Sequence, residues 1–344
     1  MASIVITGTG MYAPLRILTN EGLSMMVDTT GEWIVKRTGM HERHIASPEE
    51  ASTDMMVPAA FEAMKMANKK VDDFNLIVVS SSWMDQFVPD TSDIFAKKFG
   101  APDTTLAKAV TAQCCGFCWA IAEAYDKMRL YPEKYKTVLV VSGDATSRFV
   151  DYTDRESCIL FGDGGGAVVL EQIKEEGYGI LSYIEACDRS NMDCLSVVAG
   201  GSAKPASHET ISAKEHFMHF GDKGGGPMLE AIVPKVPELC QENCREAGIL
   251  PSELKLIIPH QLNQRIIDYA IKRLVRMGLR KGVMYDKNIA RYANCSGSSV
   301  AMALDCAYRE GLLGKGDYFQ LQSYAAGMKF AAVTGRWWIP KFTG

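Results

Sequence analysis

The feature that most constrains the fold of this chain is an order of strands and helices that occurs twice along it. Each copy has an apolar strand pattern, a helical pattern, a second helical pattern that begins at a cysteine or an asparagine, and a closing strand pattern. In the first half these segments lie at 76–79, 90–99, 114–128 and 137–142. In the second half they lie at 256–259, 265–274, 294–312 and 318–323. The alternation predicts an α/β architecture, and the repetition predicts two copies of one α/β unit packed back to back, although all α/β chains alternate to some extent.

The boundary between the two copies is expected within 171–178, after a strand pattern at 166–170. We therefore predict two domains, residues 1–172 and 173–344, which is an ordinary size for each. A stretch rich in Gly, Ser and His at 200–226 predicts a long surface loop with some contact to the active site.

The composition excludes several classes of protein. With 47% hydrophobic and 23% charged residues, the chain is typical of a soluble globular protein. The formal net charge of −4 argues against bulk nucleic-acid binding, and no apolar run reaches transmembrane length. Residues 1–6 lack the basic region of a signal peptide, so we expect a cytoplasmic protein that does not enter a membrane.

The ten cysteines predict reduced thiols rather than disulfides or a metal site. Most are scattered through apolar stretches, and no CxxC pair or His-rich cluster makes a zinc site. Cys240 and Cys244 lie one helical turn apart, but a second pair of ligands is missing from the nearby sequence. We therefore expect no bound metal.

Cys114 is the candidate nucleophile. It lies where strand-like sequence changes to an amphipathic helical pattern, just before Gly116. A thiol at a helix N-terminus meets free backbone N–H groups and the positive end of the helix dipole, which favour the nucleophilic thiolate. The alternative is a buried structural cysteine, which is the usual role of this residue type.

Two further residues lie at corresponding junctions of the second half. His260 follows the strand pattern at 256–259 and opens a polar turn, which is where active sites of α/β proteins lie. Asn294 begins the second helical pattern, as Cys114 does in the first half, and its alternative role is a helix N-cap. The duplication predicts that the first turns of these two helices face each other where the halves meet.

The glycine-rich segment at 162–166 superficially resembles a phosphate-binding loop. It lacks the lysine and the spacing of such a loop, and it leads into a strand pattern rather than a helix. We expect a tight turn whose glycines adopt positive φ.

Several motifs in order give the chain a family resemblance over nearly its whole length. They are ITGTG at 6–10, GEWIVKRTG at 31–39 with ERHI at 42–45, CCGF at 114–117, TDR at 153–155, FGDG at 161–164, PHQLNQRI at 259–266 and NCS at 294–296. With these motifs the chain resembles the β-ketoacyl-acyl-carrier-protein synthase III family of the thiolase superfamily. The resemblance implies the thiolase fold, in which two duplicated α/β halves pack as five layers (αβαβα), with the nucleophilic cysteine in the first half and the histidine and asparagine in the second.

The resemblance also implies the chemistry of an acyltransferase. Cys114 would accept an acyl group from a thioester, and a malonyl-type thioester would then lose carbon dioxide to give an enolate. His260 and Asn294 would donate hydrogen bonds to the enolate oxygen, and the backbone N–H groups of Cys114 and Ala326 would form the oxyanion hole. The implied reaction is a decarboxylative Claisen condensation with an acyl-CoA primer, without a metal or other cofactor.

Binding residues and partners follow from the same resemblance. Trp33 and Arg155 would sandwich the adenine of coenzyme A, because an indole face and a guanidinium plane suit a flat heterocycle. Thr29, Arg37 and Asn263 would complete the coenzyme A site. Phe87 and Val88 would line the acyl pocket of the second subunit of a homodimer. Acyl carrier protein is the alternative carrier.

Three departures from the family pattern favour a ketosynthase of a specialised pathway, such as polyketide synthesis, over one of fatty-acid initiation. The glycine triplet of the family reads AAG at 325–327 here, which places a Cβ on Ala326. The gating phenylalanine of the family aligns with Val88, behind a bulky segment at 83–86. A basic residue that docks the carrier protein aligns with Glu230, which weakens the case for acyl carrier protein, although Arg265, Lys272 and Arg273 remain basic.

Two other functions stay open at this point. A thiolase-fold acyltransferase that acts on an oxygen or nitrogen nucleophile, or a non-decarboxylative condensing enzyme, would use the same Cys114. An inactive partner of another ketosynthase is the third hypothesis, and the intact set of Cys114, His260 and Asn294 argues against it.

Overall fold

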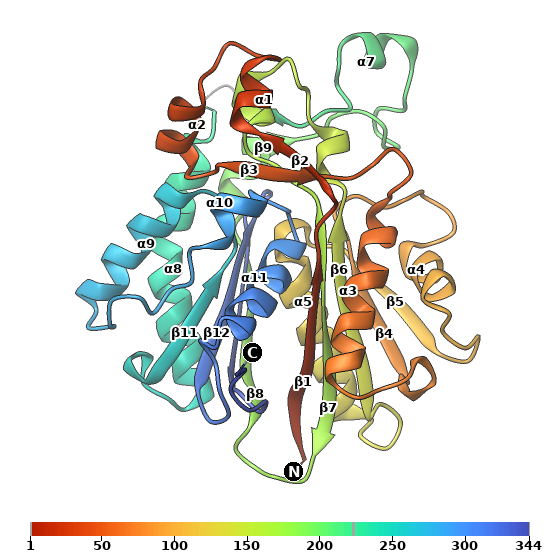
Figure 1. Cartoon of the computed structure of the whole chain (residues 1–344), viewed down its shortest axis with the longest axis vertical. Coiled ribbons are helices and arrows are strands. Elements are labelled where there is room, and N and C mark those ends of the chain that lie inside the picture. The colour runs from red at the N-terminus through yellow and green to blue at the C-terminus, as the bar shows by residue number, and fades with distance from the viewer. Residues whose placement is uncertain (1, 222–223, 344) are drawn as a thin grey trace.

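Two β-sheets form the frame of the computed structural model, which describes residues 2–221 and 224–343 (Figure 1). The first sheet has the strand order β1 (Ser3–Tyr12), β7 (Gly164–Ile173), β6 (Thr137–Asp144), β4 (Leu76–Ser80) and β5 (Leu106–Val110). The second has the order β11 (Leu254–Pro259), β12 (Tyr318–Ala325), β13 (Lys329–Arg336) and β8 (Gly179–Cys187). Each sheet contains parallel pairs: β4 pairs with β5 and β6, and β11 pairs with β12.

Six longer helices complete the layers. One outer layer consists of α3 (Ser52–Met66) and α4 (Thr91–Phe99), and the other of α8 (Gly226–Ala247) and α9 (Gln264–Arg276). Between the sheets lie α5 (Gly116–Leu130) and α11 (Ser298–Arg309), which contact both of them (Figure 1). The expected five-layer thiolase fold is therefore confirmed.

Hydrophobicity explains why α5 and α11 take the middle layer. Both helices place apolar side chains in one core cluster together with strands of both sheets. The cluster includes Phe117, Ile121, Val300 and Leu304, all fully buried. A helix that is apolar on more than one face must be covered on more than one face, and the space between two sheets provides this.

Shorter elements cover the end of the molecule at which the site lies (Figure 1). They are β2 (Arg16–Thr19), α1 (Asn20–Ser24), α2 (Gly31–Thr38), β3 (Glu42–Ile45), α6 (Arg155–Cys158), β9 (Leu195–Ser196), α7 (His208–Ser212), β10 (His219–Phe220) and α10 (Asn288–Tyr292). The stretch at 200–226 contributes α7 and β10 to this end, and its residues 222–223 lie outside the described residues.

The glycines at 162–166 do not form the expected tight turn with positive φ. None of them has a positive φ. Instead, a Cβ on Gly165 would lie 2.4 Å from the Met55 carbonyl oxygen of α3, and one on Gly166 would lie 2.4 Å from the Ala301 Cβ of α11. The predicted tight turn is wrong, because these glycines allow β7 to pack closely against a helix on each face.

The division of the chain follows the two sheets. Strands of the first sheet end at Ile173, and those of the second begin at Gly179. The domain boundary between residues 172 and 173 stays a prediction. Within the described residues, no helix combines the length and the apolar character needed to cross a membrane.

Candidate active site

Cys114 lies in a short 3₁₀ turn, Gln113–Cys115, between β5 and α5. Gln113 has a φ of 48°, which is unusual for a residue with a side chain. The Cys114 Sγ lies 3.7 Å from the Oγ of Ser296, so the turn brings the thiol to the junction before α11. The predicted meeting of the two helix starts is thus seen in this contact. Backbone strain of this kind persists where the surrounding structure holds it, often at active sites.

The protonation state of Cys114 differs from the expectation. Burial raises the pKa of this thiol to about 12; the hydrogen bond with Ser296 acts in the opposite direction, and the charge of Asp144 adds to the rise. The prediction of a thiolate is wrong for this structure, because the loss of water around the sulfur outweighs the field of the helix N-terminus.

His260 directly follows β11, and its backbone N–H donates to the Gln322 carbonyl at 2.7 Å. Its side chain is 1% exposed, and neither ring nitrogen has a hydrogen-bond partner among the described residues. Burial lowers the pKa of this imidazole to about 3, so the ring is neutral at physiological pH. A neutral ring has one nitrogen that donates and one that accepts, and neither is engaged by a described residue.

Asn294 is held by its backbone and by its side-chain oxygen. Its N–H donates to the Leu160 carbonyl and its carbonyl accepts from the Gly162 N–H, both at 3.0 Å. Its Oδ1 accepts from the Ser296 N–H at 2.9 Å, whereas its NH₂ group has no hydrogen-bond partner in the described part of the chain. The N-cap of α11 is Gly297, so the alternative role of Asn294 as that cap does not apply. The side chain therefore keeps a free donor.

A polar network lies beside Cys114, and sequence reasoning did not find it. Ser296 shares a hydrogen bond of 2.8 Å with the Ser82 hydroxyl. The Asp144 carboxyl accepts from the backbone N–H groups of Ser82 at 2.6 Å and Gly297 at 2.9 Å, and burial raises its pKa to about 7. Ser82 and Asp144 lie at the carboxyl ends of the parallel strands β4 and β6, and this position was the signal available in the sequence.

A cavity of about 490 Å³ leads to the thiol. Its walls include Cys114, Ser296, Ala326, Trp83 and Phe161. The side chains of His260 and Asn294 are buried and do not appear among the described residues that line it. The structure thus brings Cys114 and Ala326 to one cavity, whereas His260 follows β11 and Asn294 lies between α10 and α11.

Ala326 occupies the tip between β12 and β13. The residues with positive φ there are Gly327, at 76°, and Met328, at 42°, so Ala326 itself avoids the left-handed region. The extra Cβ at this position is therefore compatible with the backbone. Its N–H stays a candidate oxyanion-hole donor.

A second pocket, of about 550 Å³, contains four of the five residues expected to bind coenzyme A. Trp33, Arg37, Arg155 and Asn263 line it together, whereas Thr29 does not. The guanidinium carbon of Arg155 lies 4.9 Å from the Trp33 ring centroid, and that of Arg37 lies 5.2 Å from it. A base sandwiched between two planes separates them by about 7 Å, so Arg155 must move to admit an adenine. Asn263 caps α9, because its Oδ1 accepts from the Arg265 N–H at 2.9 Å.

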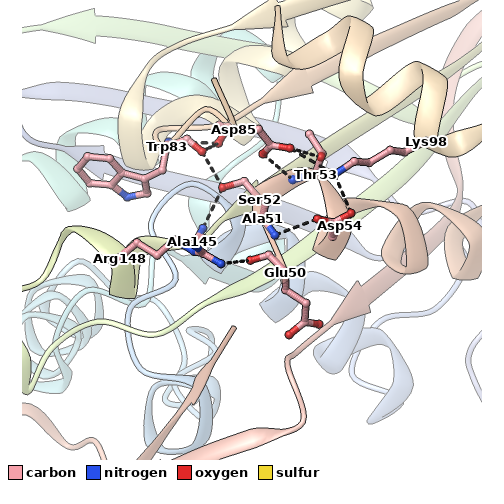
Figure 2. Close-up of polar contacts among 11 residues, drawn as sticks. Glu50, Ala51, Ser52, Thr53, Asp54, Trp83, Asp85, Lys98, Ala145 and Arg148 are labelled. Atoms are coloured by element: carbon pink, nitrogen blue, oxygen red, sulfur yellow. Dashed lines mark hydrogen bonds and ion pairs between the residues drawn. The ribbon is translucent and has the colours of Figure 1, made fainter. Parts of the chain in front are cut away.

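The loop at 81–90 is tied to α3 and α4 (Figure 2). The Ser52 hydroxyl donates to the Trp83 carbonyl at 2.6 Å, and the Thr53 N–H donates to the Asp85 carboxylate at 3.1 Å. The Thr53 hydroxyl also donates to Asp85, and Lys98 lies between Asp85, at 3.5 Å, and Asp54, at 2.7 Å. The N-cap position of α3 is an alanine, so the loop supplies the acceptor that this helix end lacks.

The tip of the same loop projects into solvent. Phe87 is 75% exposed and Val88 is 85% exposed, and neither lines the cavity beside Cys114 in this chain. Large apolar side chains with this exposure, on a loop that is otherwise held firmly, are typical of a surface that another protein covers.

The groove between α8 and α9 contains Glu230, the acidic residue that aligns with a basic residue of the family pattern. Glu230 lines it together with Lys272, Arg273 and Arg276. Its carboxylate forms no ion pair with any residue that the structure describes. The same portion of the chain contains no group of three His, Cys, Asp or Glu residues arranged to hold a metal.

Comparison with known proteins gives one consistent result. A family model described as 3-oxoacyl-[acyl-carrier-protein (ACP)] synthase III matches residues 109–188, which include Cys114. A model of the C-terminal part of the same family matches residues 244–337, which include His260 and Asn294. The β-ketoacyl-[acyl-carrier-protein] synthase III of Desulfitobacterium hafniense strain Y51 is 37% identical and covers 98% of this chain and 98% of its own length.

Comparison with solved structures gives the same result. The 3-oxoacyl-[acyl-carrier-protein] synthase III of Aquifex aeolicus VF5 superposes with a TM-score of 0.86 at 32% identity, covering 97% of this chain and 100% of its own. The priming β-ketosynthase of the R1128 polyketide pathway superposes with a TM-score of 0.88 at 28% identity, covering 98% of this chain and 97% of its own.

Proposed function

The chain belongs to the 3-oxoacyl-[acyl-carrier-protein] synthase III family of decarboxylative condensing enzymes, and on this premise we propose that it joins an acyl-CoA primer to a malonyl-type thioester through an acyl-Cys114 intermediate. The observation that carries the proposal is the state of His260. A neutral imidazole with two unpaired, buried ring nitrogens is costly to keep unless a substrate satisfies them.

In the first half-reaction, the Cys114 sulfur attacks the thioester carbonyl of the primer. The bond from the carbonyl carbon to the coenzyme A sulfur breaks, a bond to Cys114 forms, and the Cys114 proton leaves with the coenzyme A thiol. The N–H groups of Cys114 and Ala326 stabilise the oxyanion.

In the second half-reaction, the malonyl-type thioester loses carbon dioxide, and the electron pair of the broken bond becomes an enolate. The ring N–H of His260 and the NH₂ group of Asn294 donate to the enolate oxygen. The enolate carbon then attacks the acyl group on Cys114, and the sulfur leaves. Loss of one such donor typically reduces the rate by about 10²–10³.

The primer is proposed to arrive on coenzyme A, bound by Trp33, Arg37 and Arg155, with Asn263 at the same pocket. Thr29 stays a predicted contact that does not line this pocket. The similarity to a priming β-ketosynthase supports a specialised pathway, as do Ala326 and Val88 at positions where the family pattern differs. Acyl carrier protein is proposed as the weaker carrier, because Glu230 reduces the positive charge of the groove that contains it.

The active form is proposed to be a homodimer. Strand β5 is the last strand of its sheet, so one edge of it has no partner strand within the described residues. An unpaired edge strand binds another strand readily unless it is covered. Pairing of two such edges would also bring the exposed Phe87 and Val88 of one subunit toward the acyl pocket of the other.

Intact-protein mass spectrometry tests the proposal. We expect a panel of acyl-CoA thioesters to leave an acyl group on the wild type and on Cys118→Ser, and none on Cys114→Ser. Cys118 is the matched control, because it lies on the next turn and bonds to Ser323 at 3.2 Å, away from the cavity. An acyl group on Cys115 or Cys118 would contradict the assignment of Cys114.

Release of carbon dioxide separates condensation from its alternatives. We expect His260→Ala and Asn294→Ala to impair malonyl decarboxylation more than acylation of Cys114. Acylation followed by transfer to an oxygen or nitrogen nucleophile, without release of carbon dioxide, would support the second function, a thiolase-fold acyltransferase.

A further inference from the structure

A lysine faces the cavity of the nucleophile. Lys329 is the first residue of β13, and the alternation along this strand sets its direction. Ala331 and Val333 pack in the core cluster between the two sheets, whereas Phe330 and Ala332 pack in the cluster under α8. Lys329 therefore points into the middle layer and lines the cavity beside Cys114.

The contacts of Lys329 place its charge next to the nucleophile. Its Nζ donates to the side-chain oxygen of Gln113 at 3.1 Å, and Gln113 directly precedes Cys114. The Nζ also lies 5.1 Å from the centroid of the Trp119 ring. Neither contact neutralises the ammonium group, and no described carboxylate lies within ion-pair distance of it.

The cavity as a whole is positive. Arg189 lines it together with Lys329, and none of the described lining residues is an aspartate or a glutamate. The closest acid in the network, Asp144, is fully buried and engaged by Ser82 and Gly297. Cations held in a partly enclosed, largely apolar space gain most from an anion that enters with the substrate.

The remaining walls suit a short hydrocarbon segment. Leu195, Met218 and Phe161 supply apolar surface in the same cavity. We infer that Lys329 and Arg189 bind the free carboxylate of a substrate acyl group, so that the preferred thioester is the half-thioester of a short dicarboxylic acid. The inference rests on the proposed function, because it assigns the substrate class of the same site.

Two substrates can carry this carboxylate. It can be the far end of the primer on Cys114, or it can be the carboxylate of the malonyl-type extender before it leaves. The shared chemistry is an acyl thioester with a free carboxylate, and two arms of one experiment distinguish the sources.

The first arm measures the rate at which Cys114 is acylated by succinyl- and glutaryl-CoA and by butyryl- and valeryl-CoA, which have the same chain lengths without the charge. We expect Lys329→Met to reduce the ratio of charged to uncharged rates at least 10-fold and Lys329→Arg to restore most of it. The matched control is Lys134→Met, because the Lys134 Nζ also lies 5.1 Å from an aromatic ring, that of Tyr135, but outside the cavity.

The second arm measures KM for a malonyl thioester with an uncharged primer in the same variants. An increase in this KM of at least 10-fold in Lys329→Met, with an unchanged acylation ratio, would assign the carboxylate to the extender. Equal ratios and equal KM values in wild type and Lys329→Met would overturn the inference and leave the proposed function intact. Absence of any adduct on Cys114 with all four thioesters would overturn both.

Discussion

Replacing Asp85 with alanine tests how the loop at 81–90 is held. Thr53 is fully buried, and the Asp85 side chain is 9% exposed, so the contact between them is shielded from water (Figure 2). The substitution leaves the Thr53 N–H and hydroxyl without an acceptor. Each buried donor that loses its partner costs about 1–3 kcal/mol. Because some water can enter beside Lys98, which is 35% exposed, we expect a total loss of about 2–4 kcal/mol.

Urea unfolding measures this loss. Asp85→Asn keeps one acceptor oxygen and should cost less than Asp85→Ala. A double-mutant cycle with Thr53→Ala isolates the hydroxyl contact, and we expect a coupling energy within about 0.5–3 kcal/mol. The control is Asp90→Ala, because Asp90 is itself exposed and caps α4 through the Ser92 N–H at 2.8 Å. Loss of such a cap typically costs about 1 kcal/mol.

If Asp85→Ala destabilises no more than Asp90→Ala, the contact with Thr53 does not hold the loop, and α3 does not depend on it for its N-terminal acceptor. If the loop is held as described, Asp85→Ala should also weaken the proposed dimer, because Phe87 and Val88 lie at its tip.

Four further predictions follow from other parts of the molecule. Because the pKa of His260 is about 3 when folded and near 6.5 when unfolded, its contribution to stability is present above pH 6.5 and is lost as pH falls toward 3. The loss of unfolding free energy between pH 7 and pH 4.5 should therefore be about 2–3 kcal/mol smaller in His260→Asn than in wild type; equal losses would argue against a buried neutral imidazole. Gly165→Ala should cost at least about 1–3 kcal/mol in urea unfolding, because its Cβ would overlap the Met55 carbonyl, whereas Gly201→Ala, whose Cβ would meet nothing within 4 Å, should cost little. Glu230→Lys should raise kcat/KM for acyl groups on acyl carrier protein relative to coenzyme A, most strongly at low salt. An unchanged ratio would show that Glu230 does not weaken docking of the carrier protein. Sedimentation should show a dimer that Leu106→Lys, on the edge strand β5, dissociates; a fully active wild-type monomer would exclude the proposed arrangement.

The local pattern of apolar and polar residues explains which features could be predicted from the sequence alone. The strand and helix order depends on apolar periodicity, which is written along the chain, and the predicted helix at 90–99 is observed as Thr91–Phe99. Cys114, His260 and Asn294 were found because each lies at a strand end or helix start within a recognisable motif. Their catalytic roles remain predictions for the experiments above.

What the sequence by itself determined was therefore the order of the elements, the duplicated α/β fold, and the candidate residues for the chemistry. Only the tertiary structure decided the environment of those residues. Burial, which depends on parts of the chain far apart in sequence, raises the pKa of Cys114 and reverses the expectation of a thiolate. The glycines at 162–166 allow close packing against α3 and α11. Lys329 forms a hydrogen bond with Gln113, which lies 216 positions away in the sequence. Desolvation, steric contact and charge proximity depend on residues that are close in space but distant in sequence. They therefore cannot be predicted from the periodicity of one segment.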